Sequence, residues 1–490
     1  MPLKDKDIRN STKYIMSFLG IIGILCSFTI VFLMMLPINS YAKGLNMEKQ
    51  SLSVDGEEHS VDAIIYDYDN NLYLSLRDVA EALNQTDRRF DVSINSEEIN
   101  IIRGERYSPY EEEEYPWGEE YISELTNLRK QNKMNIDGRE VKYYTLLMKG
   151  SDGVYDCFMS VIDLSMILDV GLDMEDGNRI VYDSLDNGGF DALSMESFGL
   201  FEGINAALVG DATTGEVYYG YNADNRYPIA STTKLMTYLL TMEAVSKGDV
   251  SLDTMAIVSK EGEVLARGGD GVLPLRQDME ISVSELIKGA MIASSNECAF
   301  TLAETIGGSE PEFCEMMNAK AQELGLENTR FYNSHGLPVY TREPYPGKIS
   351  NCMTARDMFN MCSYIMAVYP QITEVTSLKK SSLDAIGQEV KTTNALLYNI
   401  EEITGLKTGT TNKAGCCLVS SLRVDGHDLI VVLFGAETGY DRTQISEVLC
   451  RYAMKVYNGE IKKNVTDEEN PSDDINNAEG MIKKVLNLLS

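Results

Sequence analysis

The spacing of apolar residues between positions 200 and 457 predicts strands at both ends of this stretch and helices in its middle. Residues 206–209 and 216–219 are strand-like and flank a Thr-Thr-Gly turn, and residues 418–424 and 429–434 flank an Asp-Gly turn in the same way. Two such runs joined by a short turn are typical of an antiparallel hairpin. Helical spacing is found between them, at residues 235–245 and 283–293. We therefore expect an α+β domain in which an antiparallel sheet packs on a helical cluster, with a groove where they meet.

A smaller α+β pattern occurs twice between residues 48 and 185. Residues 73–83 match residues 158–168, and each half opens with an Asp-Gly turn and closes with a strand-like run. This order predicts a two-repeat unit with a hairpin, a short helix and further strands in each half. It resembles the stalk-like module named after the copper amine oxidase N-terminal domain. Copper is not implied, because the region holds one histidine, His59, and one cysteine, Cys157. We interpret the unit as a spacer, with wall binding as the alternative.

The first 42 residues predict a signal peptide or an N-terminal membrane anchor. Basic residues such as Lys4 and Arg9 precede an uncharged apolar run over residues 14–38, about the length that a membrane-spanning helix needs. Residues 40–42, Ser-Tyr-Ala, resemble a small-x-small cleavage site, so both alternatives stay open. In either case the basic flank stays inside and the rest of the chain is delivered outside. We expect an extracytoplasmic protein that is membrane-associated or secreted to the cell wall.

The composition excludes several classes of function. The formal net charge is −32, with 43 basic and 75 acidic residues, and no basic stripe is present, so we set nucleic-acid binding aside. The three histidines are scattered, which gives no metal site and argues against a Ser-His-Asp mechanism. Nine cysteines occur without regular spacing, and we expect buried free thiols. No cofactor is predicted.

The end of the chain, residues 458–490, predicts an acidic linker and a short amphipathic tail. Ile482, Val485, Leu486 and Leu489 recur at helical spacing beside two lysines. Such a tail contacts a membrane surface or packs on the protein, and the sequence does not decide between these alternatives.

The first candidate chemical group is a serine and a lysine three residues apart. Pro228 ends a strand-like segment, and a helix is expected to begin near Ser231, so that Ser231 and Lys234 lie on one helix face. A serine at that position also lies at the positive end of the helix dipole. The S-x-x-K pattern alone is weak evidence, since Ser377 and Lys380 match it too.

Two further motifs follow in a fixed order. Ser294-Ser295-Asn296 comes at the end of a helix-like stretch, and Lys407-Thr408-Gly409 comes before the second hairpin. S-x-x-K, a Ser-x-Asn motif and K-T-G together are the signature of penicillin-binding proteins and class A β-lactamases. Residues 200–457 therefore resemble a serine D-alanyl-D-alanine carboxypeptidase of the low-molecular-mass penicillin-binding proteins, peptidase family S11. Three other segments resemble framework segments of that family, namely residues 328–337, 354–357 and 393–397.

This resemblance implies a penicillin-binding, β-lactamase-like transpeptidase fold and a role for each motif residue. The implied substrate is the peptidoglycan stem peptide ending in D-Ala-D-Ala, with β-lactams as inhibitors. The nucleophile maps onto Ser231 and the general base onto Lys234. The second catalytic dyad maps onto Ser294 and Asn296, and the contact to the substrate carboxylate maps onto Lys407 and Thr408.

The chemistry of the residues agrees with this mapping. A serine hydroxyl needs a neighbour that takes its proton, and a neutral lysine does so if burial and a second cation, Lys407, lower its pKa. The backbone N–H groups of Ser231 and Thr410 are the expected oxyanion hole. Gly409 lets its strand come close to the substrate.

Two alternatives are weighed against a carboxypeptidase. A class A-like β-lactamase adds a glutamate on an E-x-x-L-N loop, and the nearest candidate, residues 323–328, does not fit that spacing. The second alternative is a non-hydrolytic penicillin-binding sensor or wall-anchoring protein. The intact set of Ser231, Lys234, Ser294, Asn296 and Lys407 argues against it.

Overall fold

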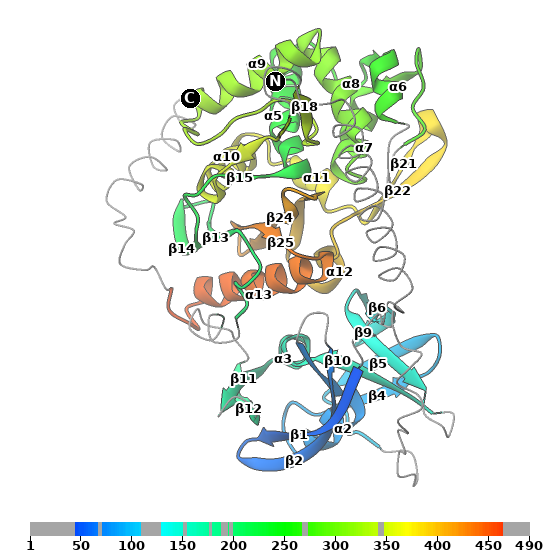
Figure 1. Cartoon of the computed structure of the whole chain (residues 1–490), viewed down its shortest axis with the longest axis vertical. Coiled ribbons are helices and arrows are strands. Elements are labelled where there is room, and N and C mark those ends of the chain that lie inside the picture. The colour runs from blue at the N-terminus through cyan, green and yellow to red at the C-terminus, as the bar shows by residue number, and fades with distance from the viewer. Residues whose placement is uncertain are drawn as a thin grey trace, which may run out of the picture.

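The computed structural model describes residues 45–66, 71–108, 129–149, 154–175, 179–187, 195, 199–266, 273–341 and 347–463. The apolar run over residues 14–38 and the amphipathic tail lie outside these residues. Within the described part of the chain, no helix has the length and apolar character needed to cross a membrane. Figure 1 shows the N-terminal strands gathered at one end of the molecule and the rest of the described chain at the other.

A five-stranded antiparallel sheet forms the centre of the C-terminal unit. Its order is β14-β13-β25-β24-β23, so that β23 is an edge strand. Both hairpins expected from the sequence are confirmed, as β13 with β14 and β24 with β25. The strands are β13 (Ala206–Asp211), β14 (Glu216–Tyr221), β23 (Ile403–Thr411), β24 (Gly415–Val424) and β25 (His427–Ala436).

Both faces of this sheet are buried, because apolar side chains alternate between them. In β25, Val431 and Leu433 belong to one core, and Val432 and Phe434 belong to the other. The first core lies under α13 (Gly439–Tyr457) and the second under a helical cluster. The cluster comprises α5 (Lys234–Lys247), α7 (Val283–Met291), α8 (Asn296–Gly307), α9 (Glu310–Glu323) and α10 (Ala355–Val368). The expected α+β arrangement of sheet and helical cluster is thus confirmed.

Short elements connect the sheet to the helical cluster. Four two-stranded ribbons are β15 (Tyr227–Pro228) with β20 (Cys352–Met353), β16 (Met255–Ile257) with β17 (Glu280–Ser282), β18 (Val339–Thr341) with β19 (Gly347–Ile349), and β21 (Lys380–Leu383) with β22 (Gln388–Lys391). Short helices are η2 (Ala230–Thr233), α6 (Lys260–Leu265), α11 (Ile372–Thr376), η3 (Asp384–Ile386) and α12 (Leu396–Asn399). The eight cysteines of the described chain are all unpaired.

The N-terminal unit contains the same local structure twice. Its hairpins turn at Asp55-Gly56 and Asp137-Gly138, where all four residues have positive φ angles. In each half a strand then leads into a short helix whose N-cap serine, Ser75 or Ser160, accepts a hydrogen bond from the aspartate amide three residues on. The two copies of this strand and helix are β3 (Asn71–Ser75) with α2 (Leu76–Ala82), and β10 (Tyr155–Ser160) with α3 (Val161–Leu168).

The two halves share their sheets. β3 and β10 pair antiparallel in the interior of an eight-stranded sheet of order β11-β12-β1-β2-β3-β10-β9-β6, and β1 pairs parallel with β12. A second sheet has the order β4-β5-β7-β8. The remaining strands are β1 (Leu45–Val54), β2 (Glu57–Tyr66), β4 (Phe90–Ile94), β5 (Glu98–Arg103), β6 (Arg129–Gln131), β7 (Lys133–Ile136), β8 (Arg139–Val141), β9 (Tyr144–Lys149), β11 (Val170–Glu175) and β12 (Arg179–Asn187). The likeness to the copper amine oxidase stalk module stays a prediction.

Buried and partly buried hydrogen bonds join the N-terminal unit to α13 and α12. Gln444 on α13 donates to Asp163 and Ser160 at 2.9 and 2.8 Å. Tyr143 donates to Glu447 at 2.5 Å, and the backbone N–H of Lys142 donates to Asn399 at 2.8 Å. A buried polar group without a hydrogen-bond partner destabilises the folded protein. These contacts therefore favour one arrangement of the two units. The N-terminal unit is therefore packed on the C-terminal unit.

Candidate active site

Ser231 lies in the turn η2, directly before α5. The sequence predicted a helix beginning near Ser231, and the structure places one 3₁₀ turn, residues 230–233, ahead of the α-helix that starts at Lys234. Ala230 has a φ of 47°, in the left-handed region that a residue with a side chain seldom adopts. This strained turn positions the half-buried Ser231 at the start of the helix, where N–H groups point outward.

The side chain of Lys234 is fully buried and makes three polar contacts. Its Nζ atom lies 2.9 Å from Ser231 Oγ, 2.8 Å from Asn296 Oδ1 and 2.9 Å from the backbone oxygen of His335. Burial lowers the pKa of Lys234 to about 7, against the opposing effect of the Glu297 carboxylate. A substantial fraction of this amine is therefore neutral near pH 7.

Ser294 and Asn296, at the start of α8, contact the two buried lysines of the site, Lys407 and Lys234. Ser295 caps α8 by accepting a hydrogen bond from the amide of Cys298. Its neighbour Ser294 has a φ of 62°, a second left-handed residue in the site. This turn places Asn296 against Lys234, while Ser294 Oγ accepts a hydrogen bond from Lys407 Nζ at 2.8 Å.

Lys407 belongs to the edge strand β23 and is 1% exposed. Its Nζ atom also donates to the backbone oxygen of Thr408 at 2.8 Å. The pKa of Lys407 is well below its usual value, first because of burial and then because of the positive charges of Lys234 and Arg442. The sequence analysis expected Lys407 to lower the pKa of Lys234, but burial is what lowers it, and the charge effect runs from Lys234 to Lys407.

The edge strand passes very close to η2 at Gly409. A Cβ atom at this position would lie 2.9 Å from the backbone N of Ser231 and 3.0 Å from that of Thr232. Any larger residue would push β23 away from the turn. The glycine therefore allows the close approach of Thr410, the next residue on β23, to the start of α5 that the expected oxyanion hole requires.

The backbone oxygen that faces Lys234 comes from the loop at residues 332–337. Asn351 holds this loop by accepting a hydrogen bond from the amide of Tyr332 at 2.7 Å and donating to Thr233 at 3.0 Å. The His335 ring accepts a hydrogen bond from the amide of Leu337, and burial lowers the pKa of His335 to about 3. His335 therefore contributes its backbone oxygen to the site, and its ring stays neutral.

The sequence analysis missed two residues beside the K-T-G strand. Arg442, in the first turns of α13, donates to the hydroxyl of Thr410 at 3.1 Å. Thr393 shares a hydrogen bond with the hydroxyl of Thr408 at 2.5 Å. No short motif marks Arg442, because its position depends on how α13 packs under the sheet. Thr393 was in a segment noted for resemblance alone.

The candidate glutamate of a β-lactamase does not belong to the site. Glu323 ends α9, its side chain is 63% exposed, and it forms an ion pair with Lys320 at 2.7 Å. Among the described contacts, none joins Glu323 to Ser231 or Lys234.

Comparisons with known proteins identify relatives of this chain. The family model for D-alanyl-D-alanine carboxypeptidases, peptidase S11, matches residues 203–438. The D-alanyl-D-alanine carboxypeptidase DacF of Bacillus subtilis is 35% identical over 248 residues, which cover 50% of this chain and 60% of that protein. The D-alanyl-D-alanine endopeptidase of Pseudomonas aeruginosa is 30% identical over 239 residues, which cover 47% of this chain and 71% of that protein.

Among solved structures, the peptidoglycan synthesis regulatory factor PBP3 of Streptococcus pneumoniae is 30% identical. The match covers 52% of this chain and 72% of that chain, with a TM-score of 0.49. The chain spans 60% of the length of DacF. The family model matches residues of the C-terminal unit only.

Proposed function

Because this chain belongs to the peptidase S11 family of D-alanyl-D-alanine carboxypeptidases, we propose that it removes the terminal D-alanine from peptidoglycan stem peptides through an acyl-enzyme on Ser231. The observation that carries the proposal is the 2.9 Å contact between Ser231 Oγ and the buried amine of Lys234. A lysine whose pKa is about 7 is a competent base for a serine at neutral pH.

The partners of Lys234 determine the direction of its lone pair. Asn296 Oδ1 and the His335 backbone oxygen only accept hydrogen bonds, so a neutral amine gives them its two N–H groups. The lone pair is then left for Ser231, the one neighbour of the three that has a proton to give. This arrangement orients the base toward the nucleophile before substrate arrives.

In the acylation step Ser231 Oγ attacks the carbonyl carbon of the penultimate D-alanine, and its proton passes to Lys234. The backbone N–H groups of Ser231 and Thr410 stabilise the oxyanion. The carbon–nitrogen bond then breaks, and the leaving amine takes a proton through Ser294. Ser294 Oγ accepts a hydrogen bond from Lys407, so its own proton is available for this transfer. Water then hydrolyses the ester.

The terminal carboxylate of the substrate is proposed to bind at the K-T-G strand, near Lys407, Thr408 and Arg442. Lys407 and Thr408 are almost fully buried, whereas Arg442 is half-buried beside Thr410. A carboxylate near these residues would raise the pKa of Lys407 and keep it charged. We assign Lys407 and Thr408 to this contact, as expected from the sequence, and add Arg442 as a second cation.

The alternatives have less support. The exposed, ion-paired Glu323 does not supply the deacylating base of a class A β-lactamase. The contact of Ser231 with Lys234 serves acylation in a carboxypeptidase and in a non-hydrolytic sensor alike, so release of D-alanine is what distinguishes the two. β-Lactams fit the proposal as inhibitors, because they acylate the same serine. Delivery outside the membrane by residues 1–42 fits a substrate located there, and a membrane contact stays part of this proposal.

The test is to incubate the purified protein with a stem pentapeptide ending in D-Ala-D-Ala and to measure free D-alanine. We expect release of D-alanine and covalent labelling by penicillin, both at Ser231. Labelling without any release of D-alanine would support the sensor instead.

A further inference from the structure

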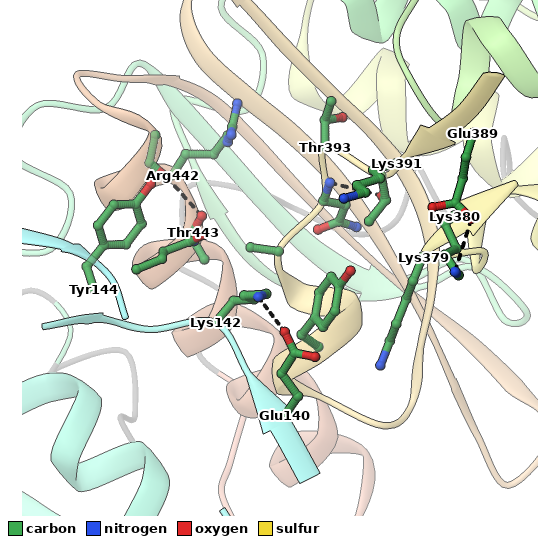
Figure 2. Close-up of a pocket in the computed structure, with 16 residues that line it drawn as sticks. Glu140, Lys142, Tyr144, Lys379, Lys380, Glu389, Lys391, Thr393, Arg442 and Thr443 are labelled. Carbon is green, nitrogen blue, oxygen red and sulfur yellow. Dashed lines mark hydrogen bonds and ion pairs between the residues drawn. The ribbon is translucent and has the colours of Figure 1, made fainter. Parts of the chain in front are cut away.

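A pocket of about 540 Å³ lies between the N-terminal unit and the C-terminal unit. We call it the junction pocket. Figure 2 shows that Glu140, Lys142 and Tyr144 of the N-terminal unit form one wall, and that Arg442 and Thr443 of α13 lie beside them. The β21–β22 hairpin and residues 392–398 form the opposite wall. The volume lies in the range of ligand sites in proteins.

The lining of the junction pocket is basic, although the chain carries a net charge of −32. Two of its lysines form ion pairs within the pocket, Lys142 with Glu140 at 2.5 Å and Lys380 with Glu389 at 3.0 Å. No other acidic residue of the described chain lines it. Three more cations line it and have no ion pair within the described part of the chain, namely Lys379, Lys391 and Arg442.

The positions of these lysines destabilise the fold, because they bring like charges together. Lys380 and Lys391 lie directly opposite each other in the β21–β22 hairpin, where like charges destabilise the pairing. Lys379 lies at the base of the same hairpin, with its Nζ atom 4.6 Å from the ring centroid of Tyr398. A group of cations that repel one another in an acidic protein is expected to bind an anion.

Two residues that line the junction pocket are hydrogen-bonded to the K-T-G strand of the proposed active site. Thr393 lines the pocket and shares a hydrogen bond with Thr408 of the K-T-G motif. Arg442 lines the pocket and donates to Thr410. Thr408 and Arg442 are assigned to the terminal carboxylate, so the pocket lies next to the place proposed for the leaving group of the substrate.

We propose that the junction pocket binds a carboxylate-bearing peptide on the leaving-group side of the scissile bond. The protein then cleaves D-alanyl bonds whose leaving group is a peptide with further carboxylates, as in cross-linked stem peptides. This inference rests on the proposed function, because the same Ser231 performs the reaction. It also gives the N-terminal unit a place in substrate binding, beyond that of a spacer.

The reaction balances without any further reactant. Ser231 Oγ forms an ester with the D-alanyl carbonyl carbon, the carbon–nitrogen bond breaks, and the peptide amine leaves with one added proton. Water then cleaves the ester, which restores the serine hydroxyl and gives a free D-alanyl carboxylate. The cations of the junction pocket only hold the carboxylates of the departing peptide.

The experiment compares three substrates with the full chain. The first is a short peptide that ends in D-Ala-D-Ala, the second is a cross-linked dimer of stem peptides with free carboxylates in the leaving peptide, and the third is the same dimer with those carboxylates amidated. We expect kcat/KM for the free-carboxylate dimer to exceed that for the amidated dimer at least about tenfold. The double variant Lys379→Ala, Lys391→Ala should lose this preference and release D-alanine from the short peptide at a rate within about twofold of the wild type.

Lys247→Ala is the matched control, because Lys247 is an exposed lysine at the end of α5. It should keep the preference for free carboxylates. Equal cleavage of the two dimers by the wild type, or an unchanged preference in the double variant, would overturn the inference. A third result would also overturn the inference: the wild type binds polyglycerol phosphate, the double variant does not, and the two dimers are cleaved equally. The pocket would then bind a wall polymer. Failure of the wild type to release D-alanine from the short peptide would instead contradict the proposed function.

Discussion

The amine of Lys407 and the hydroxyl of Ser294 form a 2.8 Å hydrogen bond that joins the edge strand β23 to the turn before α8. The sheet and the helical cluster are thus connected through two of the three motifs. Both side chains have a second role in the proposed reaction, since Ser294 passes a proton and Lys407 faces the terminal carboxylate. Changing either residue therefore affects the other.

Ser294→Ala should slow acylation by penicillin by about 10²-fold without preventing it. The variant loses the proton carrier to the leaving amine, and the buried amine of Lys407 loses an acceptor. Stopped-flow measurement of acylation with a fluorescent penicillin tests this. Ser295→Ala, which removes the cap of α8 and leaves Ser294 in place, separates a local loss of stability from the loss of the proton carrier. An unchanged acylation rate in Ser294→Ala would remove Ser294 from the mechanism.

Ser231→Ala should lower D-alanine release by at least about 10⁴-fold and abolish penicillin labelling. Among the described residues, no other hydroxyl lies within hydrogen-bond distance of Lys234 Nζ. Mass spectrometry of the labelled protein locates the acyl group. A label that persists in the variant would place the nucleophile elsewhere.

The rate of acylation should depend on pH through Lys234. Its pKa of about 7 means that the amine gains a proton as the pH falls below 7, so the rate should fall there and level off above about pH 8. Lys234→Arg should be nearly inactive at every pH in this range, because a guanidinium keeps its proton. Acylation rates between about pH 5 and about pH 9 measure this. A flat profile in the wild type would argue against a neutral lysine base.

Gly409→Ala should impair the oxyanion hole. The added Cβ would lie 2.9 Å from the backbone N of Ser231, so β23 must shift, at a cost of about 1–3 kcal/mol in stability and at least about tenfold in acylation. The control is Gly439→Ala at the start of α13, where the nearest atom would be 3.7 Å away. Thermal unfolding and acylation are measured together. Normal activity in Gly409→Ala would show that the strand approaches Ser231 less closely during the reaction.

Asp163 at the junction of the two units should make stability depend on pH. Burial raises its pKa to about 7, so the folded protein holds a proton that the unfolded chain releases near pH 4. The contribution of Asp163 to stability is therefore largest below pH 4 and decreases as the pH rises from about 4 to about 7. Asp163→Asn should raise the melting temperature at pH 7.5 by about 1–3 °C and leave it unchanged at pH 4. A lower melting temperature at both values would show that Gln444 requires the carboxylate.

The sequence was sufficient for those parts of the site in which chemistry depends on local spacing. The hairpins follow from apolar runs around turns, and the contact of Ser231 with Lys234 follows from residues one helical turn apart. The neighbours Asn296 and Lys407 were predicted through motif resemblance, and the structure brings Asn296 to the amine of Lys234 and Lys407 to the adjoining Ser294. Their contacts depend on packing between distant segments, which periodicity does not specify.

The remaining residues were missed for the same physical reason. Arg442 reaches Thr410 only because α13 lies under the sheet with one particular rotation. The backbone oxygen of His335 has no side-chain signature at all. The junction pocket depends on the docking of α13 and α12 against Arg139, Lys142 and Asp163, through polar contacts whose partners are far apart in sequence. A single sequence does not reveal which of its polar residues will meet across such an interface.

Because β1 pairs parallel with β12, the sheet of the N-terminal unit is complete only after the whole unit has been synthesised. Leu52 pairs with Ile180, so the first strand of this sheet to be synthesised is completed by the last. Until β12 follows, β1 presents an open edge to neighbouring chains, and the long loop between the two strands makes closure slow. A truncated chain that stops between the repeats would leave such edges permanently open and should aggregate. A boundary after Asn187 keeps every strand of this sheet with its partner.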